Sequence, residues 1–303
     1  MQVHAVFNRD GGTFRTLDIA AFALKAKEIF EQHGHAFQSD VVAGKDIVKA
    51  LENAATRDRD GVLMAGGGDG TISAAAAVAW KTGIPLAVLP AGTMNLFARS
   101  LKIPLELNAA LESLASGVIS AADISTANER AFVHQFAIGF QPRMIKLRNT
   151  LEYSSQWGKR LASMRAFAKV IGRPPRFAVR LTIDGASTER TVSAISVSNN
   201  PYGRGLLPIA DSLDQGKLGV YIADRISLSS LAKLAATVLM GSWRNNNDVD
   251  EILAGEVDLH FPHLHGRKRA TIDGELIPLE RNVVIKVHAG ALRVLVPAEP
   301  SPK

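Results

Sequence analysis

The 303-residue chain contains no cysteine. Disulfide bonds, thiolate-ligated zinc and a thiol nucleophile are therefore excluded, and the composition suits a reducing compartment. The chain also lacks an apolar run approaching the length of a membrane span, and Met1-Gln2-Val3-His4 begins no signal-peptide pattern. We therefore expect a soluble, cytoplasmic protein that is at most peripheral on the inner face of a membrane.

Aromatic residues that would stack on bases are few, with three tyrosines and three tryptophans. No basic motif interleaved with aromatics is present, although that pattern is typical of nucleic-acid binding. The net charge of +6 suits nucleic acid, anionic lipid or phosphorylated small molecules alike. We expect a membrane lipid and no nucleic acid as partner, since a nucleic-acid role would rest on charge alone.

The chain is organised around a glycine-rich stretch that follows a short apolar run. Val62-Leu63-Met64-Ala65 leads into Gly66-Gly67-Gly68-Asp69-Gly70-Thr71, and an alanine-rich segment follows from Ile72 to Trp80. The pattern predicts a buried strand, a tight turn and a helix. Glycines let a backbone approach a ligand, and a helix N-terminus favours phosphate, although plain packing explains such glycines equally well. The spacing matches neither the Walker A loop nor the dinucleotide motif GxGxxG.

Asp69 is the unusual member of this stretch. A carboxylate repels phosphates unless it meets Mg²⁺ or anchors the loop through hydrogen bonds. A second loop of the same design, residues 90–95, follows the expected strand 85–89. In it, Thr93 and Asn95 suit helix caps and would also suit contacts to a nucleotide phosphate. Two such loops at the carboxyl ends of successive strands line one crevice in open α/β sheets.

The two loops resemble the motifs of the diacylglycerol kinase catalytic family, which includes bacterial lipid kinases and sphingosine kinases. The resemblance rests on Gly67-Gly68-Asp69-Gly70-Thr71 and on Pro90-x-Gly92-Thr93-x-Asn95-x-Phe97-Ala98-Arg99, and it extends over nearly the whole chain. It implies an ATP- and Mg²⁺-dependent lipid kinase of phospholipid biosynthesis, with diacylglycerol at a membrane surface as the first expectation for the acceptor. A sphingoid base, another lipid alcohol or a soluble alcohol stays open as acceptor, and so does a homodimer.

The resemblance assigns nucleotide binding to residues in three loops, with Asp69 meeting the Mg²⁺ that accompanies ATP. The assigned residues are Asn8, Gly66, Gly67, Gly68, Asp69, Gly70, Thr71, Gly92, Thr93 and Asn95. NAD kinases share a related Gly-Gly-Asp-Gly-Thr loop, but the stretch 90–99 fits the lipid family better. Relatives also bind a structural magnesium through an aspartate where this chain has Gln215, so that metal is not carried over.

A kinase also needs a base for the acceptor hydroxyl, and Ile272-Asp273-Gly274-Glu275 is the candidate. The resemblance places the catalytic base at Glu275, with Asp273 beside it. The stretch Ile183-Asp184-Gly185-Ala186 has the same form without the glutamate. Because Asp-Gly between alternating strands is above all a hairpin turn, the pattern alone favours a turn at both places.

Strands and helices alternate up to about residue 125, which predicts an α/β domain with a parallel sheet and helices on both faces. Beyond it, short alternating stretches predict an all-β antiparallel sandwich that would hold the acceptor. The expected domains are 1–125 and 126–290, with a tail at 291–303 that packs back on the first domain, as the resemblance implies. Expected strands of the second part include 131–138, 191–198, 283–288 and 292–296.

Three further features leave alternatives open. Phe140 to Arg173 suits a basic amphipathic helix on anionic lipid or, more commonly, a helix with a core face and a solvated face, and Ser227 to Trp243 suits a second helix. His260, His263 and His265 suggest a metal site only weakly. A regulatory protein that binds nucleotide or lipid without turnover is the rival from another functional class.

Overall fold

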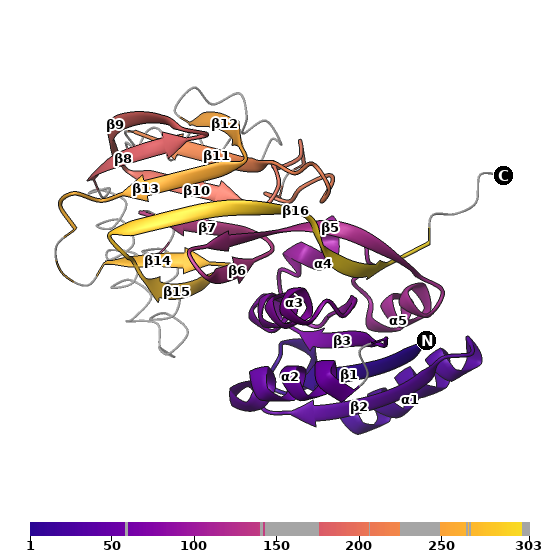
Figure 1. Ribbon diagram of the computed structural model, residues 1–303. Coiled ribbons are helices and arrows are strands. Elements are labelled where there is room, and N and C mark those ends of the chain that lie inside the picture. Colours follow the sequence, from indigo (N-terminus) through magenta and orange to yellow (C-terminus); the bar gives the residue numbers. More distant parts are fainter. Residues whose placement is uncertain are drawn as a thin grey trace.

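The computed structural model shows two lobes that share one large sheet (Figure 1). It describes residues 1–57, 60–139, 142, 176–205, 207–224, 249–264, 266 and 268–298. The helices expected at 140–173 and 227–243 thus lie outside the described residues, apart from residue 142. In the described part of the chain, no helix is long and apolar enough to cross a membrane.

The N-terminal lobe is an α/β unit whose strands lie parallel in the order β2-β1-β3-β4. Helices α1 and α5 pack together, as do α2 and α3. Since crossovers between parallel strands are right-handed, the strand order β2-β1-β3-β4 puts α1 on one face of the sheet and α2 and α3 on the other. The elements are β1 (Gln2–Asn8), a 3₁₀ turn (Thr13–Arg15), α1 (Ile19–Gln32), β2 (Ala36–Val42), a 3₁₀ turn (Gly44–Asp46), α2 (Ile47–Arg57), β3 (Val62–Gly67), α3 (Asp69–Thr82), β4 (Leu86–Pro90), α4 (Leu96–Ser100) and α5 (Leu107–Ala115).

Local sequence explains these elements well. Strands β3 and β4 are buried along their whole length, as their unbroken apolar runs predict for a sheet covered on both faces. The carboxylate of Asp18 caps α1 by accepting from two backbone N–H groups, and Gly83 ends α3 with φ of 74°. The first lobe therefore follows the expected α/β pattern.

The C-terminal lobe is an antiparallel sandwich, which confirms the predicted fold class. One layer is the six-stranded sheet β12-β11-β10-β7-β14-β15, and the other continues the first lobe's sheet through β16-β13-β8-β9. The strands are β5 (Val118–Ala127), β6 (Arg130–Phe132), β7 (Gln135–Ile138), β8 (Phe177–Ile183), β9 (Ala186–Val192), β10 (Ala194–Ser198), β11 (Leu218–Ala223), β12 (Asp250–Ala254), β13 (Glu256–His260), β14 (Arg269–Ile272), β15 (Glu275–Pro278) and β16 (Asn282–Val296).

Strand β16 joins the two lobes. It pairs with β13 in the sandwich and, through Val294 and Leu295, runs parallel to β4 of the first lobe. Strand β5 accompanies it across the junction, with a register shift between His288 and Leu292. The two strands expected at 283–288 and 292–296 are therefore one bulged strand.

Two other expected strands are each divided between the two sheets. Residues 131–138 form the end of β6, which pairs with β5, and all of β7, which pairs with β10 and β14. Residues 191–198 likewise cover the end of β9 and all of β10. In both places an alternating run of residues continues while the backbone changes sheet, as strands do at the corners of sandwiches.

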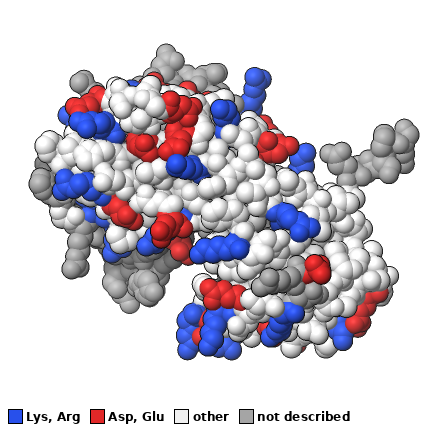
Figure 2. Space-filling model, in the orientation of Figure 1, with Lys and Arg blue, Asp and Glu red and all other residues white. Residues whose placement is uncertain are grey.

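Charge is distributed rather than gathered on the face shown in Figure 2. Lysine and arginine side chains alternate with aspartate and glutamate side chains over both lobes on that face. No single basic area is visible on this side of the molecule.

Candidate functional site

Three loops meet at the carboxyl ends of β1, β3 and β4, and they touch backbone to backbone. A β-carbon placed on Gly92 would lie 2.6 Å from Cα of Gly68, and one placed on Gly12 would lie 2.8 Å from the carbonyl oxygen of Ala91. The N–H of Ala91 donates to the carbonyl of Gly67 at 3.0 Å. Glycine at positions 12 and 92 therefore permits a contact that any side chain would block.

Asp69 anchors these loops to one another. Its two carboxylate oxygens accept from the N–H groups of Asn95, at 3.2 Å, and Leu96, at 2.8 Å, at the start of α4. The side chain of Asn95 instead bonds twice to the backbone of Gly92, so the cap of α4 comes from Asp69 and not from Asn95. Of the two roles considered for Asp69, loop anchoring is observed, and each oxygen keeps a second acceptor position.

The N-terminus of α3 has no side-chain cap, in contrast to α1 and α5. Its N-cap residue is Gly68, so the first N–H groups of the helix have no partner within it. Asn8 lies beside this turn and donates through Nδ2 to the hydroxyl of Thr71 at 2.9 Å. An uncapped helix start flanked by polar side chains is suited to an anionic ligand.

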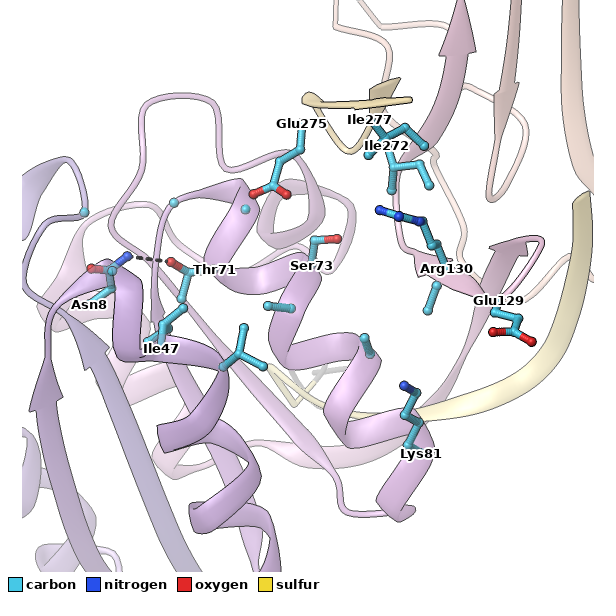
Figure 3. Close-up of a pocket in the computed structure, with 18 residues that line it drawn as sticks. Asn8, Ile47, Thr71, Ser73, Lys81, Glu129, Arg130, Ile272, Glu275 and Ile277 are labelled. Atoms are coloured by element: carbon cyan, nitrogen blue, oxygen red, sulfur yellow. Dashed lines mark hydrogen bonds between the residues drawn. The ribbon is translucent and has the colours of Figure 1, made fainter. Parts of the chain in front are cut away.

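Two cavities flank this turn. The first, here the α3 cavity, has a volume of about 670 Å³ and lies along α3 between Asn8 and Lys81 (Figure 3). The second, here the loop cavity, has a volume of about 680 Å³ and is lined by residues of the 90–95 loop and by His134. Gly68, Gly70 and Glu275 line both cavities. The two spaces therefore meet at the start of α3.

Glu275 enters this meeting point from the other lobe. It is the first residue of β15, and its exposed carboxylate points toward the start of α3 (Figure 3). A β-carbon placed on Gly70 would lie 2.7 Å from Oε1 of Glu275. The structure therefore brings the predicted base and the predicted phosphate-binding turn into contact, although Glu275 lies 205 positions after Gly70 in the sequence.

Asp273 is held differently. It is 8% exposed, and its carboxylate accepts from the backbone N–H groups of Val133, His134 and Gln135 and from the hydroxyl of Ser73. The turn at Asp273 and Gly274 has φ of 46° and 86°, as in a two-residue hairpin. The turn predicted from the Asp-Gly pattern is therefore present here.

Sequence reasoning missed His134, which no motif marks. Its Nε2 is buried without a hydrogen-bond partner, and its ring packs 5.8 Å from that of Tyr202. Burial lowers the pKa of His134, while the nearby carboxylates of Asp273 and Asp69 act in the opposite direction. The imidazole is therefore neutral at pH 7.

The ten residues assigned to nucleotide divide into two groups. Asn8, Gly68, Asp69, Gly70, Thr71, Gly92 and Thr93 line one or both cavities. Gly66, Gly67 and Asn95 do not. A β-carbon on Gly66 would meet the rings of Phe7 and Phe14, and one on Gly67 would meet the side chain of Thr71, so these two glycines serve the packing of the turn.

The described residues contain no group of three or more histidine, aspartate or glutamate side chains that could hold a metal ion by itself. His260 bonds to the side chain of Asn282 at 2.6 Å, and His265 lies outside the described residues. Asn199 and Asn200, at the end of β10, are buried and donate to Asp123 rather than facing either cavity.

Comparison with known proteins identifies two domain families. Residues 2–127 match the family described as diacylglycerol kinase catalytic domain, and residues 147–296 match the YegS C-terminal NAD kinase beta sandwich-like domain. The match to a crystal structure from Bacillus anthracis, described as "a putative diacylglycerol kinase", has a TM-score of 0.72 at 18% identity and covers 97% of this chain and 96% of that one. This likeness shows the shared fold.

Two relatives found by sequence cover most of this chain. A Staphylococcus epidermidis protein named "Putative lipid kinase" is 24% identical over 256 residues, which are 83% of this chain and 81% of the relative. An uncharacterized protein of Synechocystis is 26% identical over 278 residues, or 85% of this chain. The chain spans about 60% of the length of that cyanobacterial relative.

Proposed function

Because its two matched domains place this chain in the diacylglycerol kinase catalytic family, we propose that it transfers the γ-phosphate of ATP to the hydroxyl of a lipid, with diacylglycerol as the first candidate. One observation carries the proposal. The carboxylate of Glu275, from the sandwich lobe, lies against the uncapped N-terminus of α3, at the point where two cavities meet. Phosphoryl transfer requires such a meeting of donor, acceptor and base.

The α3 cavity is suited to the nucleotide. It opens at the carboxyl ends of β1 and β3, where α/β sheets bind ligands, and it includes Asn8 and Thr71 beside the free N–H groups of α3. Ile47 and Val48 add an apolar surface against which the adenine ring of ATP could pack. Phosphates at the start of α3 would then reach Gly68 and Gly70, which both cavities share.

The loop cavity is suited to the acceptor. It approaches the same turn from the side of Gly92, Thr93 and Met94, and Met94 is 42% exposed at this position. A hydroxyl that enters from this side meets Glu275 and the phosphate-binding turn together. Glu275 would accept the hydroxyl proton as the γ-phosphate is transferred.

The oxygen ligands for Mg²⁺ fit this arrangement. Each carboxylate oxygen of Asp69 accepts one backbone N–H and keeps another acceptor position, and Asp69 lines the loop cavity next to the phosphate-binding turn. Mg²⁺ prefers one or two carboxylates combined with substrate phosphates to an all-protein cage. When bound with ATP, the ion would neutralise charge on the phosphates, and Asp69 is the residue that would hold it.

A transfer assay tests the proposal. Purified protein is incubated with γ-labelled ATP, Mg²⁺ and a membrane-lipid extract, in parallel with Glu275→Gln. We expect a labelled lipid with wild type and a loss of at least about 100-fold in kcat for Glu275→Gln, since general base catalysis contributes that much. The variant should still bind nucleotide, because glutamine keeps the size of the side chain and removes a negative charge that repels the phosphates.

The outcomes separate the alternatives. Mass spectrometry of a labelled product names the acceptor and distinguishes diacylglycerol from a sphingoid base. Labelling of a soluble alcohol alone would contradict the lipid proposal. ATP binding with no transfer to any acceptor would indicate the non-catalytic regulator, and an active Glu275→Gln enzyme would remove Glu275 from the role of base.

A further inference from the structure

The carboxylate of Asp273 is saturated with hydrogen bonds. Oδ1 accepts from the N–H groups of His134 and Gln135, both at 2.9 Å. Oδ2 accepts from the N–H of Val133 at 3.0 Å and from the hydroxyl of Ser73 at 2.7 Å. An ionised carboxylate offers about four acceptor positions, so all of them are occupied.

The four hydrogen bonds to the Asp273 carboxylate make it poorly suited to act as the general base. A general base must reach the proton that it removes, and Asp273 would first have to give up one of these four bonds. Glu275, two residues further along the same hairpin, is exposed and lines both cavities. The two carboxylates of the Asp-Gly-Glu stretch therefore have different tasks.

Ser73 is the one donor of the four that belongs to the N-terminal lobe. It lies on α3 three residues after Gly70, on the same face of the helix. Its hydroxyl therefore ties the β14–β15 hairpin to α3 beside the place where Glu275 meets Gly70. Because the two-residue turn at Asp273 and Gly274 is tight, a shift of Asp273 would also shift the backbone of Glu275.

As an extension of the proposed function, we propose that Ser73 and Asp273 are positioning residues that hold the carboxylate of Glu275 at the phosphate-binding turn. The Ser73 hydroxyl fixes the distance between the lobes at this point. The three backbone N–H groups fix the orientation of the hairpin within the sandwich. Ser73 lines the α3 cavity and Asp273 lines the loop cavity, and both act on the transfer through the position of Glu275.

The chain supplies its own control in the second Asp-Gly turn. Asp184 has φ of 45° and accepts from the N–H groups of Gly255 and Glu256, so it also secures a hairpin to the start of a neighbouring strand. It lines neither cavity. Asp184→Asn therefore disturbs the same kind of turn away from the site.

The first measurement compares Ser73→Ala, Ser73→Thr and Asp184→Asn by steady-state kinetics over a range of pH. For Ser73→Ala we expect kcat to fall about tenfold or more, since small misplacements of reacting groups are costly. The acid limb of the pH–rate profile should not move, and the dissociation constant for ATP should change much less than kcat, although Ser73 lines the α3 cavity. Ser73→Thr, which keeps the hydroxyl, should recover most of the rate, and Asp184→Asn should keep the wild-type kcat.

Two kinetic results would overturn the proposal. An unchanged kcat in Ser73→Ala would show that the bond positions nothing of consequence. A shift of the acid limb to higher pH would show that Asp273 itself titrates as the base, because removal of a donor raises the pKa of a carboxylate.

A second measurement does not depend on activity. Since the chain has no cysteine, Lys49→Cys on α2 and Arg269→Cys on β14 can carry two spin labels without background. Ser73→Ala should broaden or lengthen the distance distribution between the labels, and Asp184→Asn should leave it unchanged. An unchanged distribution in Ser73→Ala would overturn the positioning role. A broadened distribution in Ser73→Ala, together with a wild type that labels no acceptor, would contradict the proposed function alone.

Discussion

His134 illustrates how one side chain can link stability to pH near the site. Burial lowers its pKa below the ordinary value near 6.5, so folding favours the neutral ring. Its contribution to stability is therefore complete above the unfolded-state pKa and is lost as the pH falls through the lower, folded-state pKa.

We predict that the free energy of unfolding decreases more steeply between pH 7 and pH 5 in wild type than in His134→Asn. Urea titrations at a series of pH values, in buffer free of divalent cations, measure this difference. Parallel slopes for the two proteins would show that His134 does not protonate on unfolding in this range.

At the scale of elements, the contact between the two glycine loops can be tested with a matched pair of substitutions. A β-carbon on Gly92 would lie 2.6 Å from the backbone of Gly68, whereas one on Gly68 finds only Cα of Gly92, at 3.6 Å. Gly92→Ala should therefore cost about 1–3 kcal/mol of stability through overpacking and weaken ATP binding.

Gly68→Ala is the control, because its methyl group has room in the folded protein and should leave the unfolding midpoint close to that of wild type. Thermal unfolding and calorimetric titration with ATP measure both effects. Equal stability losses in the two variants would contradict the loop contact.

The elements also show which parts of the structure a sequence can predict. The centre of the first lobe was predictable because β3 and β4 are unbroken apolar runs, each followed by a glycine-bearing turn, so their signals are local. The stretch 131–138 reads as one strand, yet Asp273 takes the backbone N–H groups of residues 133–135, and the chain changes sheet there. No local pattern reports a partner 140 residues away.

The same reasoning applies to the candidate site. Motifs placed Glu275 and the glycine turn in the site, and the structure brings them into contact. Ser73 and His134 were missed because their importance comes from Asp273 and from burial, which the sequence does not display. Gly66 and Gly67 belong to the motif, but they are needed for packing against neighbouring side chains and not for ligand contact. A motif shows that glycine is required at a position, but it does not show whether the ligand or the protein interior requires the space.

At the scale of the whole molecule, Asp123 fastens the junction of the two lobes. It is fully buried on β5, and its carboxylate accepts from the side chain of Asn200 and from the N–H groups of Gly216 and Gly290. Gly290 belongs to the bulge of β16, where the strand passes from one lobe to the other. The three donors come from three separate segments, so the carboxylate holds the shared sheet and the sandwich together.

We predict that Asp123→Asn lowers the free energy of unfolding by about 1–3 kcal/mol or more, because the amide group would face backbone donors that it cannot satisfy. Since β5 and β16 run through both lobes, the loss should appear as one cooperative transition at a lower midpoint. Calorimetry, with far-UV and near-UV circular dichroism as separate probes, shows whether unfolding occurs in one transition or in two. Two resolved transitions, with one at the wild-type midpoint, would mean that the lobes unfold independently and that the shared sheet does not couple them.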